Sequence, residues 1–313
     1  MMTSLSRVRL KSLSLLSLGM IGVMILLTAC GGSSGTNTSA NTSKDKKLNI
    51  TVGGKLDTEA QLLTKMYVLL LQKAGFNVTE KAKLGTNDIV FNAINSGQID
   101  LYPEFTATGL NRLGVTTTHD PQQDYQKVKQ GYEKNYKITW LDPSPLNDTY
   151  GICTLKTTAD KDHLTKVSDL ASMAATKTIA TPPDGKTDPN VLPGFKKVYG
   201  FDFPNTKVLD AALTYEAVKT GQADFNICYT TSSLIKQDNF VLLQDDKNSF
   251  PIYNPAPLVR MDTLSQDPDI ATALNPLAPK LTTDVSIELQ SEVTGGQSVS
   301  EVAHNFLTKV GLL

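Results

Sequence analysis

Two aromatic residues followed by threonine, Phe105–Thr106 and Tyr229–Thr230, end two segments that are similar in sequence. Residues 91–100 and 215–224 share an aromatic residue, Ala, an aliphatic residue and Gly-Gln-x-Asp at identical spacing, offset by 124 residues. Ligands in open α/β sheets bind at the carboxyl ends of strands. We therefore expect Phe105 and Tyr229 to face each other across a cleft, where the chemistry is non-covalent binding of a small molecule.

Patterns typical of covalent or metal chemistry are weaker. Ser233-x-x-Lys236 and Lys219-Thr220-Gly221 match fragments of penicillin-recognising serine enzymes, but their order is reversed and no Ser-Asp-Asn lies between them. A Gly-x-Ser-x-Gly match at residues 31–35 lies in a Gly/Ser-rich stretch without a flanking strand and helix. A cell-surface serine hydrolase remains the alternative from a different class of protein. Turnover of an ester or β-lactam substrate that is lost in Ser233→Ala would favour it.

The histidines do not have the spacing of a metal site, because His119, His163 and His304 are isolated from one another and from cysteine. The sequence contains no Walker A loop and no dinucleotide-binding fingerprint. We therefore expect no metal and no cofactor.

Alternating strands and helices must position the aromatic residues. Residues 48–52 alternate as a short strand that closes at Gly53-Gly54-Lys55, and an apolar stripe predicts a helix that ends at Gly75. Residues 76–81 form a second expected strand, followed by a helix that ends at Gly97. This alternation with short connections predicts an α/β sheet.

The composition allows one large domain or two ordinary ones, since 40% of the 313 residues are hydrophobic and 19% are charged. The chain has 30 basic and 31 acidic residues, a formal net charge of −1. This balance gives no electrostatic reason to expect a nucleic-acid partner.

The N-terminal segment is typical of a secretory signal, with three basic residues ahead of the uncharged stretch 13–27. That stretch is short for a membrane-spanning helix, which needs about 20 residues. Leu27-Thr28-Ala29-Cys30 resembles the bacterial lipobox, in which the cysteine is lipidated and becomes the first residue. An ordinary signal peptide is the alternative. We expect residues 1–29 to be a lipoprotein signal peptide and residues 30–47 to be the anchor and a flexible tether.

Several ordered blocks lie between about Leu48 and the C-terminus. They are Gly53-Gly54-Lys55-x-x-Thr58-Glu59, Asp100-x-Tyr102-Pro103-Glu104-Phe105-Thr106-x-Thr108, Asn147-Asp148-Thr149-Tyr150, Tyr229-Thr230-Thr231 and Asp245-Asp246-Lys247-x-x-Phe250-Pro251-x-Tyr253-x-x-Ala256-Pro257. Together these blocks resemble the substrate-binding lipoproteins of osmoprotectant ABC importers, which bind quaternary amines such as glycine betaine, carnitine and choline.

The resemblance implies a two-lobed α/β class II periplasmic-binding-protein fold with a ligand cleft between lobes. It assigns residues 48–145 and 260–313 to lobe 1 and residues 146–259 to lobe 2. It also implies an aromatic cage around a trimethylammonium group, which has no N–H to donate and is attracted to the negative faces of rings. The family's cage positions fall on Phe105, Tyr150, Tyr229 and Tyr253.

The resemblance further implies ligand contacts from the backbone carbonyl of Asp148 and, for a carboxylate, from Lys55 and Thr108. One departure concerns the carboxylate. Pro182 stands where the family commonly has a carboxylate-binding Arg, and proline cannot replace the guanidinium. A ligand without a carboxylate, such as choline, is therefore a credible candidate, and another betaine such as ergothioneine is an alternative.

The expected protein is not an enzyme but an extracytoplasmic receptor, lipid-anchored to the bacterial membrane through Cys30. We expect a monomer that delivers its ligand to an ABC permease, with ATP hydrolysis on a separate ATPase subunit. Cys153 and Cys228 lie beside two cage positions. After export they could form a disulfide or stay as separate buried thiols.

Overall fold

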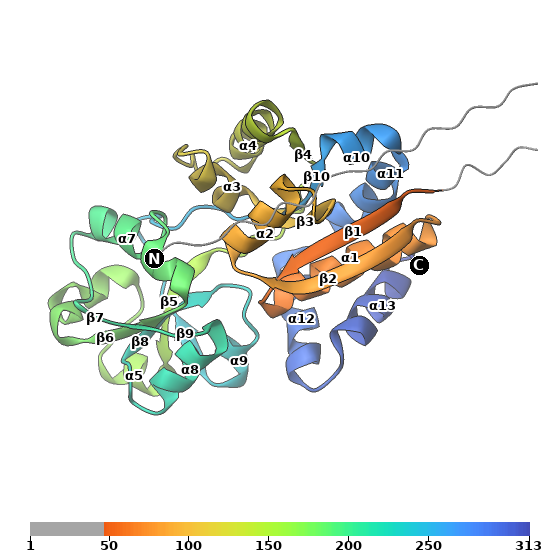
Figure 1. Cartoon of the computed structure of the whole chain (residues 1–313). Coiled ribbons are helices and arrows are strands. Elements are labelled where there is room, and N and C mark those ends of the chain that lie inside the picture. The colour runs from red at the N-terminus through yellow and green to blue at the C-terminus, as the bar shows by residue number, and fades with distance from the viewer. Residues whose placement is uncertain (1–46) are drawn as a thin grey trace, which may run out of the picture. The chain divides into compact units, whose positions relative to one another are not determined.

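The computed structural model describes residues 47–313. The expected signal peptide, the lipidation site Cys30 and most of the tether lie outside the described residues. The described chain builds two five-stranded mixed sheets, with strand orders β2-β1-β3-β10-β4 and β7-β6-β8-β5-β9 (Figure 1). An α/β fold was predicted from the sequence, and it is confirmed.

The first sheet is formed by both ends of the described chain. Its parallel strands β2, β1 and β3 are followed by β10, which is antiparallel to β3 and β4. The C-terminal helices α12 and α13 pack against α1 (Figure 1). The elements are β1 (Asn49–Lys55), α1 (Thr58–Lys73), β2 (Asn77–Gly85), α2 (Asn87–Asn95), β3 (Leu101–Phe105), α3 (Thr106–Arg112), α4 (Pro121–Tyr136), β4 (Ile138–Trp140), β10 (Pro255–Arg260), α10 (Met261–Gln266), α11 (Asp269–Leu274), the 3-10 helix Asn275–Lys280, α12 (Thr283–Thr294) and α13 (Val299–Lys309).

The second sheet has the same order of directions. Strands β7, β6 and β8 are parallel, and β5 is antiparallel to β8 and β9. The elements are β5 (Tyr150–Leu155), α5 (Lys156–Lys161), the 3-10 helices Val167–Ser172 and Ala174–Thr176, β6 (Thr178–Thr181), α6 (Pro183–Thr187), α7 (Leu192–Tyr199), β7 (Asn205–Val208), α8 (Ala211–Lys219), β8 (Phe225–Tyr229), α9 (Leu234–Gln237) and β9 (Phe240–Leu242).

The repeated Gly-Gln-x-Asp segments play the same part in both sheets. Each follows a helix, α2 or α8, and its glycine adopts a positive φ, 77° at Gly97 and 70° at Gly221. The Asp100 carboxylate accepts from the Thr51 N–H at 2.7 Å, and the Asp224 carboxylate accepts from the Thr178 N–H at 2.8 Å. The repeated segment therefore links the start of β3 to β1 in the first sheet and the start of β8 to β6 in the second.

Strand β1 continues through Gly53-Gly54-Lys55, where the sequence predicted that it would close. The two glycines serve close packing rather than a turn. A Cβ on Gly53 would lie 2.4 Å from Ile99 Cδ1, and one on Gly54 would lie 2.4 Å from Thr64 Oγ1. Strand β2 is likewise longer than predicted and ends at Gly85. Both strands therefore reach further toward the site.

Two chain segments connect the sheets, residues 141–149 and residues 243–254, and they run side by side. The Asp148 N–H donates to the Tyr253 carbonyl at 3.1 Å, and the Tyr253 N–H donates to Asn147 Oδ1 at 2.8 Å. Asn254 Nδ2 donates to the Leu146 carbonyl at 2.8 Å. Strand β10 starts at Pro255 and pairs with β3 of the first sheet.

The apolar core covers both faces of each sheet. One large cluster runs from Ile50 and Leu71 through Leu146 to Phe195 and Phe225, and smaller clusters lie around Trp140 and around Cys153. Cys153 and Cys228 form a disulfide between β5 and β8, with Cα atoms 5.9 Å apart. Within residues 47–313, no helix combines the length and the apolar character needed to cross a bilayer.

Candidate functional site

A cavity of about 560 Å³ is lined by residues of both sheets and of the connecting segments. Its volume suits a small organic ligand. The structure brings all seven residues that the sequence assigned to ligand binding to this cavity: Lys55, Phe105, Thr108, Asp148, Tyr150, Tyr229 and Tyr253.

Strand register places two of the tyrosines together. Tyr150 begins β5 and Tyr229 ends β8, and the antiparallel pairing sets them directly opposite each other. Residues opposite each other on adjacent strands point to the same face of a sheet. Their ring centroids are accordingly 5.1 Å apart, with ring planes at 38°.

The other two rings come from the first sheet and the returning segment. Tyr253 lies just before β10, and its ring meets Tyr150 edge-on at 5.4 Å and 81°. Phe105 ends β3, where it pairs with Pro255. The four expected cage residues therefore reach the cavity from four separate segments of the chain, and Tyr215 of α8 is a fifth aromatic residue in the lining. Phe105, Tyr150 and Tyr253 are each at most 7% exposed.

Lys55, at the end of β1, is held by a carboxylate. Its Nζ lies 2.5 Å from Glu104 Oε1, and the Glu104 side chain is fully buried. Glu104 also accepts from the Phe105 N–H and the Tyr102 hydroxyl, both at 2.8 Å. Lys55 Nζ lies 5.0 Å from the centre of the Phe105 ring. The positive charge of Lys55 is thus paired inside the protein.

Apart from Lys55, the charged side chains of the lining are all acidic. Burial raises the pKa of Asp148 to about 7, although the Thr231 hydroxyl donates to its Oδ1 at 2.6 Å. Burial also raises the pKa of Glu59, and the nearby Asp148 adds to this shift. Lys55 is the sole basic residue among the described lining residues. The acidic residues of the lining are Asp57, Glu59, Asp148, Asp184 and Asp210.

Polar contacts cross the cavity from one sheet's region to the other. Asn87 Nδ2 donates to Asp184 Oδ2 at 3.1 Å. Gln290 Nε2 donates to the Thr231 carbonyl at 3.1 Å, and the Ser233 and Thr294 hydroxyls lie 3.1 Å apart. These contacts join α2 and α12 to the second sheet's region, so the cavity is closed over by side chains of both.

Residues 49–309 match the family model described as the substrate-binding domain of ABC-type glycine betaine transport systems. The chain belongs to this family. It is 30% identical over 276 residues to the glycine betaine-binding protein YehZ of Escherichia coli, covering 84% of this chain and 90% of the relative. It is 28% identical to the carnitine transport binding protein OpuCC of Listeria monocytogenes, covering 96% of each chain.

Solved structures of the family share the fold. A crystal structure titled as a glycine betaine/carnitine/choline ABC transporter is similar with a TM-score of 0.70 and 28% identity, covering 84% of this chain and 99% of that one. The class II periplasmic-binding-protein fold that the sequence resemblance implied is thus confirmed. The family is one of transport receptors rather than enzymes.

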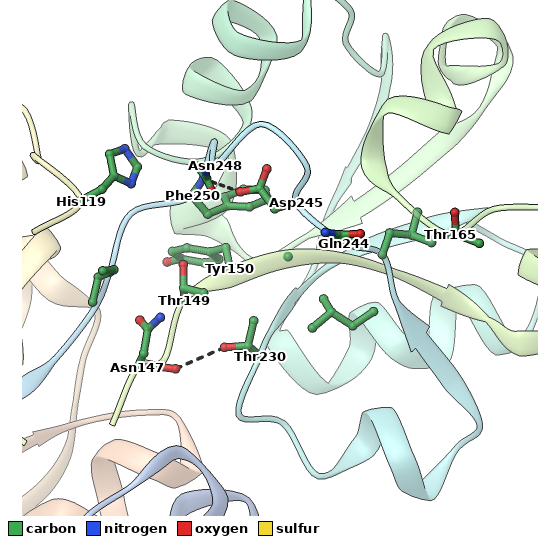
Figure 2. Close-up of a pocket in the computed structure, with 14 residues that line it drawn as sticks. His119, Asn147, Thr149, Tyr150, Thr165, Thr230, Gln244, Asp245, Asn248 and Phe250 are labelled. Atoms are coloured by element: carbon green, nitrogen blue, oxygen red, sulfur yellow. Dashed lines mark hydrogen bonds between the residues drawn. The ribbon is translucent and has the colours of Figure 1, made fainter. Parts of the chain in front are cut away.

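A second hollow, of about 720 Å³, differs from the cavity in its lining. Figure 2 shows it between His119, which precedes α4, and the segment around Asp245, Asn248 and Phe250. Tyr150 lines both hollows. Thr230 Oγ1 donates to the Asn147 carbonyl here at 3.3 Å. The second hollow contains one cage tyrosine, whereas the cavity contains all four cage residues.

The residues of the serine-hydrolase alternative do not form an activated nucleophile. Ser233 Oγ contacts the Thr294 hydroxyl, and Lys236 is exposed. Activation of a serine needs an adjacent base. Among the described residues, no group of three His, Cys, Asp or Glu side chains is placed to hold a metal ion.

Sequence reasoning missed several lining residues. Glu59, Asp184 and Tyr215 line the cavity but were not predicted there, and Glu104 does not line it but holds Lys55, a role that the sequence did not indicate. The sequence does single out Tyr215, since it is the aromatic residue that begins the second repeated segment. No sequence pattern indicates the pairing of Lys55 with Glu104, because the two residues are 49 positions apart and meet only through the side-by-side placement of β1 and β3.

Proposed function

We propose that this protein is the extracytoplasmic receptor of an ABC importer and captures a small quaternary ammonium compound in the cavity between its two sheets. The observation that carries the proposal is the convergence of Phe105, Tyr150, Tyr229 and Tyr253 on one cavity. Family membership and the acidic lining support it independently.

A trimethylammonium group is bound here by ring faces. It has no N–H, so hydrogen bonds cannot select it, whereas aromatic faces attract the positive charge. Each desolvated ring contact contributes about 0.5–2 kcal/mol. Four such contacts therefore supply a large part of the roughly 8 kcal/mol that corresponds to a micromolar Kd.

The binding step is proposed to be closure of two lobes around the ligand. We take lobe 1 as residues 48–145 and 260–313, and lobe 2 as residues 146–259. Tyr150 and Tyr229 belong to the second sheet, whereas Phe105 belongs to the first. The full cage exists only when the lobes approach, so ligand binding shifts the population toward the closed form.

The closed form would be recognised by the permease, while a separate subunit hydrolyses ATP. We propose that a lipid on Cys30 holds the receptor at the membrane and that the tether up to residue 47 gives it reach. With residues 1–29 removed, 27 basic and 31 acidic residues remain, a net charge of −4. A monomer suffices for this role, since the described residues of one chain supply the whole cage.

Isothermal titration calorimetry with choline, carnitine, glycine betaine and ergothioneine tests the proposal. We expect micromolar binding of at least one trimethylammonium compound. Tyr229→Ala should weaken it by about tenfold, since one ring contact is lost. Tyr136 is also half-buried but packs against Phe91 and Tyr132 outside the cavity, so Tyr136→Ala is the matched control. Absence of binding of all four compounds at millimolar concentration would contradict the proposal.

A further inference from the structure

One residue of each sheet's region lines the cavity at a corresponding point in the two repeats. It is basic in the first sheet and proline in the second. Lys55 lies four residues after Thr51, and Pro182 lies four residues after Thr178. The backbone N–H groups of Thr51 and Thr178 donate to the carboxylates of Asp100 and Asp224 in the two Gly-Gln-x-Asp segments. Lys55, the last residue of β1, and Pro182, the residue that follows β6, therefore occupy corresponding positions, and both line the cavity.

Lys55, the basic residue at the first position, is already paired with a carboxylate. Glu104 is 0% exposed and Lys55 is 7% exposed, and their charged atoms are 2.5 Å apart. A buried carboxylate without its cation is strongly unfavourable, so Glu104 keeps Lys55 in place. At the second position, Pro182 has no charge and no donor. Among the described lining residues, no other basic side chain is available to a ligand carboxylate.

The remaining lining attracts positive charge and repels negative charge. With Lys55 and Glu104 cancelling, five acidic side chains and no unpaired basic one are left among the described lining residues. Burial raises the pKa of Glu59 and Asp148, so these two contribute less negative charge to the cavity than Asp57, Asp184 and Asp210 together. Opposite charges attract more strongly in a partly buried site than in water, and like charges repel more strongly there. A ligand that carries a carboxylate beside its ammonium group would bring that carboxylate into an acidic environment.

A buried oxygen favours a hydroxyl at the other end of the ligand. Glu59 lines the cavity, and its Oε1 is buried without a hydrogen-bond partner among the described residues. A hydroxyl both donates and accepts, so it can satisfy this carboxyl group whether or not Glu59 is protonated. A ligand carboxylate accepts only, and it can bond to Glu59 only when Glu59 is protonated.

Resting on the proposed function, we infer that this cavity selects a quaternary ammonium alcohol, the chemical class of choline, over carboxylated betaines, and that Glu104 sets this preference by holding Lys55. Glu104 is then a specificity-determining residue that need not touch the ligand. Choline and glycine betaine are the right probes, because both carry trimethylammonium and they differ in a hydroxyl against a carboxylate.

The experiment measures the Kd values of choline and glycine betaine by calorimetry for the wild-type protein and for Glu104→Gln. Wild type should bind choline at least about tenfold more tightly. Glu104→Gln frees the Lys55 charge and should shift the ratio of the two Kd values about tenfold toward glycine betaine. Glu80→Gln is the matched control, because it breaks the Lys65–Glu80 ion pair outside the cavity and should leave the ratio unchanged.

Pro182→Arg provides a second test that does not disturb the buried pair. It adds a guanidinium at the corresponding end of β6 and should strengthen glycine betaine binding while weakening choline binding. Wild-type binding of glycine betaine as tight as that of choline would overturn the inference and leave the proposed function standing. An unchanged ratio in both variants would overturn the role of Glu104 and Pro182. Binding of neither compound, nor of carnitine or ergothioneine, would overturn the proposed function itself.

Discussion

The two sheets are built on one plan and carry different chemistry at corresponding positions. In each, a Gly-Gln-x-Asp segment ties a central strand to its neighbour and ends that strand at the cavity, at Phe105 or at Tyr229. One residue before these aromatics lies Glu104 in the first sheet and Cys228 in the second. The backbone plan therefore sets where side chains meet the ligand, and single residues decide what they offer.

This difference divides the tasks between the two regions. The first sheet buries an ion pair, Lys55–Glu104, under one aromatic ring. The second sheet replaces charge with a disulfide, Cys153–Cys228, behind two tyrosines. We conclude that the second sheet supplies two of the four cage rings, and that the ion pair of the first sheet neutralises the sole basic side chain among the described lining residues.

Removing the disulfide should have the largest effect. The bond closes a loop with a sequence separation of 75 residues, and loss of such a bond typically costs about 2–5 kcal/mol. Cys153→Ala/Cys228→Ala should therefore lower the free energy of unfolding by about 3 kcal/mol in urea titrations. It should also weaken choline binding, because the bond lies next to Tyr229. Unchanged stability would show that the second sheet does not depend on this brace.

The repeated aspartates should have comparable effects on both sides. Asp100→Ala and Asp224→Ala each leave a threonine N–H without its carboxylate partner, which costs about 1–3 kcal/mol. Denaturant unfolding of the two variants should give losses within about 1 kcal/mol of each other. A large loss in one and none in the other would break the structural equivalence of the two segments.

Much of this equivalence could be predicted from sequence, because glycine and aspartate at fixed spacing signal a helix end and a turn. The cage positions could be named from ordered motifs. The sequence predicts too early an end for β1, because Gly53 and Gly54, which are needed for close packing against Ile99 and Thr64, look the same in sequence as glycines that end a strand. The acidic lining could not be predicted, because it gathers five residues from four separate segments of the chain.

The pH dependence of choline binding tests whether the negative charge of Asp148 contributes to affinity. Burial raises the pKa of Asp148 to about 7, and Asp57 and Glu59 face the same cavity together with Lys55. A bound cation favours the ionised carboxylate, so choline affinity should rise severalfold, up to about tenfold, between pH 6 and pH 8. Calorimetry in buffers of different ionisation enthalpy should detect proton release. Asp148→Asn should flatten the profile, whereas a flat wild-type profile would contradict this assignment.

The raised pKa of Asp148 also makes the stability of the ligand-free protein depend on pH, and this stability falls as the pH rises. The folded protein keeps a proton on Asp148 that the unfolded chain releases above its ordinary pKa of about 3.9. The contribution of this carboxyl group to stability is therefore fully present below pH 4 and is lost as the pH rises to about 7. Asp148→Asn should consequently gain stability relative to wild type at pH 8 and not at pH 4, as measured by urea unfolding.

The contact between Asn87 and Asp184 should have the smallest effect. It is a single hydrogen bond between the two regions, worth about 1 kcal/mol at most in favour of closure. Asn87→Ala should raise the Kd of choline by about two- to fivefold without changing the ratio of choline to glycine betaine. A change in that ratio would show that Asn87 contacts the ligand rather than supporting closure.

A crystal structure of the protein with choline tests the central claim most directly. We predict the trimethylammonium group among Phe105, Tyr150, Tyr229 and Tyr253, with the hydroxyl toward Glu59 and Lys55 still paired with Glu104. Choline in the second hollow (Figure 2), which shares Tyr150 with the cavity, with the cavity itself left empty, would contradict the claim.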